Sequence, residues 1–258
     1  MARLRCVLIA VLLASAATAA AASSPDLATV PISRLNIPWW KARFMHKQAE
    51  LRQSPPKLVW IGDSITQDWE REGPPAWEDF APVWRRFYGD RHAINLGFRG
   101  DSTCHVLWRL QHGELDRIAP KGVILLIGAN NFGRVHTDAA QTEAGIKAIL
   151  DLLHHRLPAT KVLLISVLPS IRSHWVSQNT IELDDRLGEL SVREGPWLRY
   201  RDLRHLFERH NEPDPALYID PRLTPPQPAL HPTAEAQAAL AQAIEPDVHI
   251  MMDDQLHR

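Results

Sequence analysis

The sequence predicts an α/β protein in which helices cover both faces of a parallel sheet. Short apolar runs recur along the chain, and segments with helical character lie between them. Each run is bounded by Gly, Pro or polar residues, which suits strands that are buried on both faces. Strands that alternate with helices of this length are typical of a parallel sheet in a three-layer sandwich. The runs are Leu58–Ile61, Ala93–Leu96, Val123–Ile127 and Val162–Val167, and Trp197–Leu203 is a weaker candidate for a fifth strand.

Six segments have the periodicity or composition of helices. The stretch Trp39–Leu51 is amphipathic, which predicts a surface helix. Pro82 interrupts the segment Trp77–Phe87, because proline lacks the N–H that a helix interior needs. Pro232 precedes the last, Ala-rich segment, and proline suits the first turn of a helix. The other predicted helices are Thr103–Gln111, Thr137–Leu157, Asn179–Arg193 and Thr233–Ile244.

The N-terminal residues have the layout of a cleavable secretory signal. Two arginines precede an apolar run, Val7–Leu13, and small residues fill positions 14–22. Because the apolar run is short and passes into alanines, cleavage is favoured over a single membrane anchor. We therefore expect a signal peptide at 1–22, a linker at 23–32 and one catalytic domain at 33–250, with no stable membrane insertion after cleavage.

Cysteine content and charge limit the location and the partners. Cys6 lies inside the predicted signal, so Cys104 alone would remain and no internal disulfide could form. An export signal without a disulfide fits a bacterial periplasm or the surrounding medium. The 29 Lys and Arg residues nearly balance the 30 Asp and Glu residues, so we expect no nucleic acid partner. The 13 histidines show no zinc-ligand spacing with Cys or carboxylates, so no metal is expected.

Four polar clusters are predicted to meet at one edge of the sheet. Three of them follow a predicted strand directly, and the fourth stands just before the last helix. Because ligands of open α/β sheets bind beyond the carboxyl ends of the strands, we expect a functional site there. The clusters are Gly62–Thr66, Gly97–Ser102, Gly128–Asn131 and Leu230–Thr233.

Together the clusters contain the parts of an acyl-transfer site. Ser64 would open a helix directly after a strand, where free amides and the helix dipole favour a developing negative charge. A serine hydroxyl needs a base within hydrogen-bond reach, and His231 could supply it. The oxyanion donors would be the backbone N–H groups of Ser64 and Gly100 and the side-chain amide of Asn130. Each such donor is typically worth about 3 kcal/mol.

Each cluster also has an ordinary interpretation. Asp63 and Ser64 are both good helix N-caps, and the segment Gly97–Ser102 could be a simple turn between a strand and a helix. Asn130 would serve equally well as a turn residue, and His231 as a solvated loop histidine. The catalytic hypothesis therefore depends on all four clusters occurring together in this order.

The order of the clusters resembles the four sequence blocks of the SGNH, or GDSL-type, hydrolases. The serine, glycine, asparagine and histidine that name the family would be Ser64, Gly100, Asn130 and His231. The stretch Gly100–Leu110 looks similar to the second block of the branch of platelet-activating-factor acetylhydrolases. The resemblance implies a flavodoxin-like three-layer α/β/α sandwich with about five parallel strands. It also implies ester hydrolysis through an acyl-enzyme intermediate, without a metal or an organic cofactor.

The chain departs from the family's pattern where the third triad member should stand. Relatives usually carry an aspartate three residues before the histidine, and here Pro228 occupies that position. The run Ala216–Asp220 resembles the stretch that leads into that aspartate, which would make Pro221–Pro228 an inserted loop and Asp220 the displaced acid. Two alternatives stay open: a Ser–His dyad whose histidine is held by a backbone carbonyl, and a decayed enzyme that only binds.

Five further residues near the blocks have weaker functional interpretations. Asp68 stands where relatives often have Gly, and Arg99 is a bulky cation beside the predicted oxyanion glycine. Arg99 is either a solvated turn residue or a group that steers substrates with an anionic group. Trp69 and Trp175 are candidates for a substrate wall, whereas Cys104 is expected to be a small buried residue.

The sequence thus predicts a secreted or periplasmic serine esterase that hydrolyses short acyl esters, such as acetyl esters, of carbohydrate or lipid. Its partner would be a small-molecule, glycan or lipid ester. The catalytic residues would be Ser64, His231 and Asp220. The competing hypothesis is a noncatalytic carbohydrate- or envelope-binding protein on a degenerate version of the same fold. Pro228 favours that hypothesis, and the intact serine, glycine, asparagine and histidine set argues against it.

Overall fold

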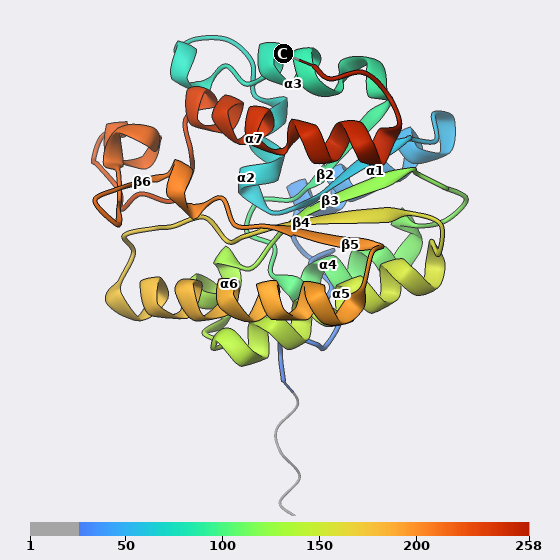
Figure 1. Ribbon diagram of the computed structural model, residues 1–258, viewed down its shortest axis with the longest axis horizontal. Coiled ribbons are helices and arrows are strands. Elements are labelled where there is room, and N and C mark those ends of the chain that lie inside the picture. Colours follow the sequence, from blue (N-terminus) through green and yellow to red (C-terminus); the bar gives the residue numbers. More distant parts are fainter. Residues whose placement is uncertain (1–25, 258) are drawn as a thin grey trace, which may run out of the picture.

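Five parallel strands form the central sheet, in the order β2-β1-β3-β4-β5. The computed structural model describes residues 26–257 of the chain. Figure 1 shows helices on both faces of the sheet, which confirms the predicted three-layer α/β/α sandwich. The strands are β1 (Leu58–Gly62), β2 (Ala93–Gly97), β3 (Gly122–Leu126), β4 (Lys161–Ile165) and β5 (Leu198–Arg201).

Helices α3 and α7 cover one face of the sheet, and α4, α5 and α6 cover the other (Figure 1). A small antiparallel hairpin of β6 and β7 follows the sheet. The helices are α1 (Pro38–Gln53), α2 (Ser64–Gln67), α3 (Ala81–Tyr88), α4 (Thr103–Arg109), α5 (Ala139–Arg156), α6 (His174–Glu194) and α7 (Ala234–Met252). The hairpin strands are β6 (Glu208–Arg209) and β7 (Glu212–Pro213), and single helical turns lie at Asp68–Glu70, Ala76–Glu78, Gly89–Arg91, Leu110–Glu114, Asn131–Val135, Arg204–Leu206, Pro215–Leu217 and Asp220–Arg222.

The central strands bury both of their faces, as their continuous apolar runs predict. In β1, Val59 and Ile61 pack in the layer of α4, α5 and α6, whereas Leu58 and Trp60 pack in the layer of α3 and α7. Burying each such side chain stabilises the fold by about 1.5–3 kcal/mol. Because all five strands are parallel, their carboxyl ends and the loops that follow them meet at one edge of the sheet.

Two proline residues affect helix boundaries differently from the prediction. Pro82 lies in the first turn of α3 and so begins the helix, whereas we expected it to interrupt a longer one. Pro246 lies inside α7, which runs eight residues beyond its predicted end at Ile244. The residues after the proline include Val248 and Met252, which are buried against the sheet, and their burial offsets the backbone hydrogen bond that the proline removes.

The start of α6 also differs from the prediction. The helix begins at His174, five residues before the predicted start at Asn179. Its N-cap is Ser173, whose Oγ accepts a hydrogen bond from the N–H of Val176 at 3.2 Å. This cap satisfies one of the free N–H groups of the first turn, which stabilises the longer helix.

The predicted signal peptide, 1–22, lies outside the described residues. The described part of the predicted linker, 26–32, packs against α4. Ala28 is fully buried and its carbonyl accepts a hydrogen bond from the Thr103 hydroxyl at 2.8 Å. The N–H of Ile32 donates to the carbonyl of Cys104 at 3.0 Å, and Cys104 itself is buried, as expected. Within residues 26–257, no helix has both the length and the apolar composition that crossing a membrane would require.

Candidate active site

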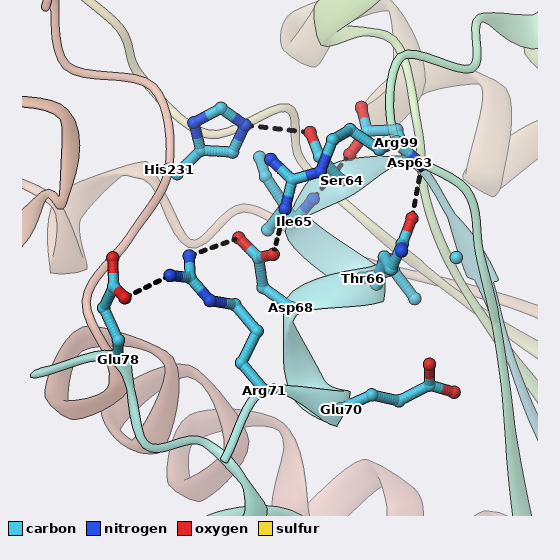
Figure 2. Close-up of polar contacts among 12 residues, drawn as sticks. Asp63, Ser64, Ile65, Thr66, Asp68, Glu70, Arg71, Glu78, Arg99 and His231 are labelled. Carbon is cyan, nitrogen blue, oxygen red and sulfur yellow. Dashed lines mark hydrogen bonds and ion pairs between the residues drawn. The ribbon is translucent and has the colours of Figure 1, made fainter. Parts of the chain in front are cut away.

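The first cluster lies at the junction between β1 and α2. The strand ends at Gly62 and the helix begins at Ser64. Asp63 caps the helix, since its Oδ1 accepts a hydrogen bond from the N–H of Ile65 at 3.0 Å. Figure 2 shows the imidazole of His231 facing Ser64, and the distance from Ser64 Oγ to His231 Nε2 is 2.9 Å. The hydroxyl and the imidazole are therefore placed for direct proton transfer.

The loop before α7 holds His231 through its backbone and through Asp220. The N–H of Ile219 donates to the carbonyl of His231 at 2.7 Å. Asp220 Oδ1 lies 2.7 Å from His231 Nδ1, and Oδ2 accepts the N–H groups of Leu230 and His231 at 2.8 and 2.6 Å. Among residues 26–257, Asp220 and no backbone carbonyl lies against the ring nitrogen that faces away from Ser64.

The environment of Asp220 favours its ionised form. Burial by itself would raise the pKa of this carboxyl, but the hydrogen bond from His231, the charge of His231 and the two backbone N–H donors outweigh it. The pKa of Asp220 consequently lies below its ordinary value. An ionised carboxylate at this position fixes the orientation of the imidazole and stabilises the protonated ring.

The turn after β2 carries Gly100, the second predicted oxyanion donor. Gly100 has φ +77°, a conformation that residues with a Cβ rarely adopt. Its N–H donates to no group among the described residues. The N–H of Ser64 belongs to the first turn of α2 and has no partner within the helix. Both groups therefore remain available to an oxygen of a bound molecule.

Asn130 connects these two segments. Its Nδ2 donates to the carbonyl of Asp101 at 3.0 Å and to Asp63 Oδ2 at 3.2 Å. The amide thus lies between the residue before Ser64 and the residue after Gly100, so the structure brings the three predicted oxyanion residues together. Donation to a bound oxygen would replace the longer of the two contacts, which is the one to Asp63.

Asp63 is more than a helix cap, because its carboxyl group is also buried and has a raised pKa. The carboxyl is buried, and burial raises its pKa to about 6, against the opposing effects of the Ile65 hydrogen bond and of the charge on His231. The only signal in the sequence was its position directly before Ser64.

A buried ion network supports the turn that carries Gly100. Asp101 accepts hydrogen bonds from Arg34 at 2.7 Å, from Trp40 Nε1 at 2.8 Å and from Arg109 Nε at 2.9 Å. Arg109 also pairs with Glu114, and both side chains are fully buried. Buried charges are stable only when they are paired and hydrogen-bonded, so the network fixes the turn in one position.

The two smaller departures from the family's pattern form an ion pair with each other. Arg99 Nη2 lies 2.7 Å from Asp68 Oδ1, and Figure 2 shows the Arg99 side chain reaching Asp68. The Asp68 side chain is 1% exposed, whereas that of Arg99 is 48% exposed. Burial raises the pKa of Asp68, and the charges of Arg99, His231 and Arg71 oppose this rise. The Arg99 guanidinium is therefore held at the rim of the site with half of its surface open.

The two tryptophans predicted as a substrate wall lie in different environments. Trp69 is 2% exposed and packs against Trp60 and Tyr88, with 5.7 Å between ring centroids in both pairs. The prediction for Trp69 is wrong, because its ring belongs to the core layer of α3 and α7. Trp175 is 39% exposed and packs edge-on against Phe132, so its role stays a prediction.

Other features of the described residues do not join this site. No three His, Cys, Asp or Glu side chains within 26–257 are grouped as metal ligands would be. A cavity of about 380 Å³ lies between α6 and the β6–β7 hairpin, and Ser64, His231 and Asp220 do not line it.

The chain is similar in sequence to known proteins. A model of the GDSL-like lipase/acylhydrolase family matches residues 60–239. Platelet-activating factor acetylhydrolase IB subunit alpha1 from Bos taurus is 39% identical over 130 residues, which are 50% of this chain and 51% of that protein, so the match spans about half the length of this relative.

Two solved structures share the fold. A GDSL-like lipase from Bacteroides thetaiotaomicron superposes with a TM-score of 0.63 and 18% identity, over 81% of this chain and 97% of that one. A carbohydrate acetylesterase family member from Sinorhizobium meliloti superposes with a TM-score of 0.58 and 15% identity, over 76% of this chain and 98% of that one.

Proposed function

The chain belongs to the GDSL-like lipase/acylhydrolase family, and we propose on this premise that it is a serine esterase acting on carboxylic esters. The observation that carries the proposal is the hydrogen-bonded series Ser64, His231 and Asp220, with distances of 2.9 and 2.7 Å. Pro228 was the feature that favoured a noncatalytic binding protein. We assign the role of the missing acid to Asp220, whose Oδ1 lies 2.7 Å from His231 Nδ1, and with this assignment Pro228 gives the alternative no support.

In the acylation step, Ser64 Oγ attacks the carbonyl carbon of the ester and His231 Nε2 accepts the hydroxyl proton. The carbonyl oxygen becomes an oxyanion, which the N–H groups of Ser64 and Gly100 and the Asn130 amide stabilise. Asp220 stabilises the imidazolium through Nδ1. When the tetrahedral intermediate collapses, the bond to the alcohol oxygen breaks, and His231 returns its proton to that oxygen.

Deacylation repeats these steps with water. His231 removes a proton from a water molecule, the hydroxide attacks the acyl carbon, and the same donors stabilise the second oxyanion. The bond to Ser64 Oγ then breaks, the serine regains a proton from His231, and the carboxylic acid leaves. None of these steps needs a metal or an organic cofactor.

A short acyl group, such as acetyl, is the substrate class that we propose. The Bos taurus relative is named as an acetylhydrolase, and the Sinorhizobium meliloti protein is described as a carbohydrate acetylesterase family member. The alcohol part would belong to a carbohydrate or a lipid. Release of acetate from acetylated xylan, acetylated chitooligosaccharides and acetylated glycerolipids would separate the two classes.

Labelling with a fluorophosphonate tests the nucleophile. The probe reacts covalently with an activated serine, so the wild-type chain should become labelled and Ser64→Ala should not. Ser102→Ala is a matched control, because this serine lies in the Gly100 turn and has no assigned role in the chemistry. Absence of label in the folded wild-type chain would end the esterase proposal.

We also propose that the chain is exported. The support is the order of the N-terminal residues: two arginines, the apolar run Val7–Leu13 and the small residues at 14–22. Expression of the full chain in a bacterium should give a periplasmic or secreted form that begins near residue 23, which N-terminal sequencing would detect. A cytoplasmic form that retains Met1 would contradict the proposal.

A further inference from the structure

Three consecutive strand-end loops each place one arginine beside the site. Arg99 follows β2, Arg134 follows β3 and Arg172 follows β4. We call these residues the arginine cluster. Arg172 and Arg134 are close enough for their charges to repel, and such repulsion is unfavourable unless negative charge lies between them.

Arg172 is the central member of the arginine cluster. Its Nη2 donates to the carbonyl of Ala129, the residue before Asn130, at 2.9 Å, and its Nε donates to Ser170 Oγ at 3.2 Å. The side chain is half-buried, and no carboxylate of residues 26–257 lies within 4.0 Å of the guanidinium. Burial lowers the pKa of Arg172. The charges of Asp63 and Asp220 oppose this shift, and the charge of Arg134 adds to it.

The backbone leaves room for this guanidinium. A Cβ atom added to Gly133 would lie 2.1 Å from Arg172 Nη1, so any larger residue there would displace the side chain. A half-buried arginine that lacks an ion pair normally costs stability, because its charge is only partly solvated. The arrangement is therefore better explained by a negative group that binds there than by a structural role.

Arg134 and Arg99 extend the positive charge towards the predicted oxyanion glycine. A Cβ atom on Gly100 would lie 3.5 Å from Arg134 Cζ and 3.4 Å from the Arg34 guanidinium. Arg34 has its ion pair with buried Asp101, whereas Arg134 has no ion pair with any residue of 26–257. Arg99 is fixed by Asp68 and keeps half of its surface open.

We propose that the arginine cluster binds an anionic group, a carboxylate or a phosphate, carried by the ester that Ser64 attacks. This inference rests on the proposed esterase function and adds the charge of the substrate to it. Guanidinium groups form paired hydrogen bonds with both anions, and such charge-assisted bonds are stronger in a partly buried site. The near-neutral net charge of the chain gives no hint of this local excess of positive charge.

Matched esters measure this preference directly. Para-acetoxybenzoate and its neutral methyl ester differ in one charge on the alcohol part, and para-acetoxyphenyl phosphate replaces the carboxylate by phosphate. The pair p-nitrophenyl hemisuccinate and p-nitrophenyl butyrate moves the charge to the acyl part. We expect the wild-type chain to have a higher kcat/KM for the anionic member of at least one pair, and salt should reduce the difference.

Variants then assign the preference to the arginine cluster. Arg172→Gln should lower the ratio of anionic to neutral kcat/KM by about ten-fold, which corresponds to one charge-assisted hydrogen bond. Arg99→Gln and Arg134→Gln should lower it by about three- to ten-fold. Gly133→Ala, which displaces the guanidinium of Arg172 without removing its charge, should give a smaller loss.

The control is Arg156→Gln, at the end of α5, which removes an exposed arginine paired with Asp116 and should leave the ratio unchanged. Equal losses on anionic and neutral esters in the arginine variants, or a wild-type chain without any anionic preference, would overturn the proposal. If the chain fails to label with a fluorophosphonate, calorimetry of Ser64→Ala with inorganic phosphate and with para-acetoxybenzoate still tests the arginine cluster. Binding that weakens in the double variant with Arg172→Gln supports it, and absence of binding refutes it.

Discussion

Two carboxylates near the reacting atoms differ in the hydrogen bonds that they accept: Asp220 lies against His231, and Asp63 lies against Asn130. We call the surroundings of Asp220 the histidine side and those of Asp63 the oxyanion side. Asp220, on the histidine side, lies within 2.6–2.8 Å of three nitrogen atoms, and its pKa lies below the ordinary value. Asp63, on the oxyanion side, accepts one backbone N–H at 3.0 Å and one amide at 3.2 Å, and burial raises its pKa to about 6. Asp220 therefore keeps its negative charge down to a lower pH than Asp63 does, so the negative charge on the oxyanion side is the less favoured of the two.

This difference matches what each side does in the proposed reaction. An imidazolium forms on the histidine side, where the Asp220 charge stabilises it. An oxyanion forms on the oxyanion side, where a second negative charge on Asp63 would oppose it. The Arg172 guanidinium, which has no ion pair within residues 26–257, lies on that same side, where it would stabilise the negative charge that we propose for the substrate.

Asp220→Asn should produce the largest effect on turnover. The amide keeps the shape of the side chain but cannot hold the imidazole in the tautomer that accepts the Ser64 proton, so kcat should fall by about 10⁴. Steady-state hydrolysis of p-nitrophenyl acetate measures the loss. Asp214→Asn is the matched control, because Asp214 caps a turn of the same loop and lies outside the hydrogen-bonded series. Unchanged turnover in Asp220→Asn would favour a Ser–His dyad and remove the contrast between the two carboxylates.

The contribution of Asp63 to the unfolding free energy should decrease as the pH rises from about 4 to about 6. Its pKa rises from the ordinary value of 3.8 to about 6 in the fold, so over this interval the folded state binds a proton that the unfolded state has released. The loss amounts to about 3 kcal/mol of unfolding free energy at most. Asp220, whose pKa is lowered, contributes with the opposite sign, since its stabilisation is lost as the pH falls.

Urea unfolding of wild type and Asp63→Asn across this pH interval isolates the contribution of Asp63. The asparagine can still accept the Ile65 N–H but does not titrate, and contributions from other groups cancel in the difference between the two proteins. The difference in unfolding free energy should change by up to about 3 kcal/mol between the two ends of the interval. A difference that stays constant with pH would mean that folding does not change the pKa of Asp63.

The histidine side also shows where sequence reasoning succeeds and where it stops. Strands β1 to β4 could be predicted because burial leaves continuous apolar runs, whereas β5 was a weaker candidate, since only Leu198 of its four residues is buried. The parallel topology then brings the ends of β1, β2 and β3 together. Asp220 was one of three alternatives, because its distance to His231 depends on how ten intervening residues fold back. The backbone bond from Ile219 N–H to the carbonyl of His231 closes that loop, and no local pattern encodes it.

The oxyanion side was predicted less completely for the same physical reason. Gly100 lies three residues beyond β2 and Asn130 four residues beyond β3, so their positions could be inferred from the strand ends. Arg134 and Arg172 lie several residues beyond β3 and β4, and their directions depend on the loop conformations. Trp69 was predicted as a candidate for a substrate wall, but it lies in the turn Asp68–Glu70 and packing against Trp60 and Tyr88 buries it.

The smallest expected effect is on unfolding free energy, and it should distinguish arginines that stabilise the fold through an ion pair from those that have none. Arg34→Gln removes an ion pair from buried Asp101 and should cost about 2 kcal/mol of unfolding free energy. Arg134→Gln removes a charge that has no ion pair within 26–257 and that repels Arg172, so unfolding free energy should change by less than about 0.5 kcal/mol. At low salt the change should be slightly stabilising, because screening is weakest there. If Arg134→Gln instead destabilised the chain as much as Arg34→Gln, Arg134 would be part of the scaffold, and the oxyanion side would be as fully satisfied as the histidine side.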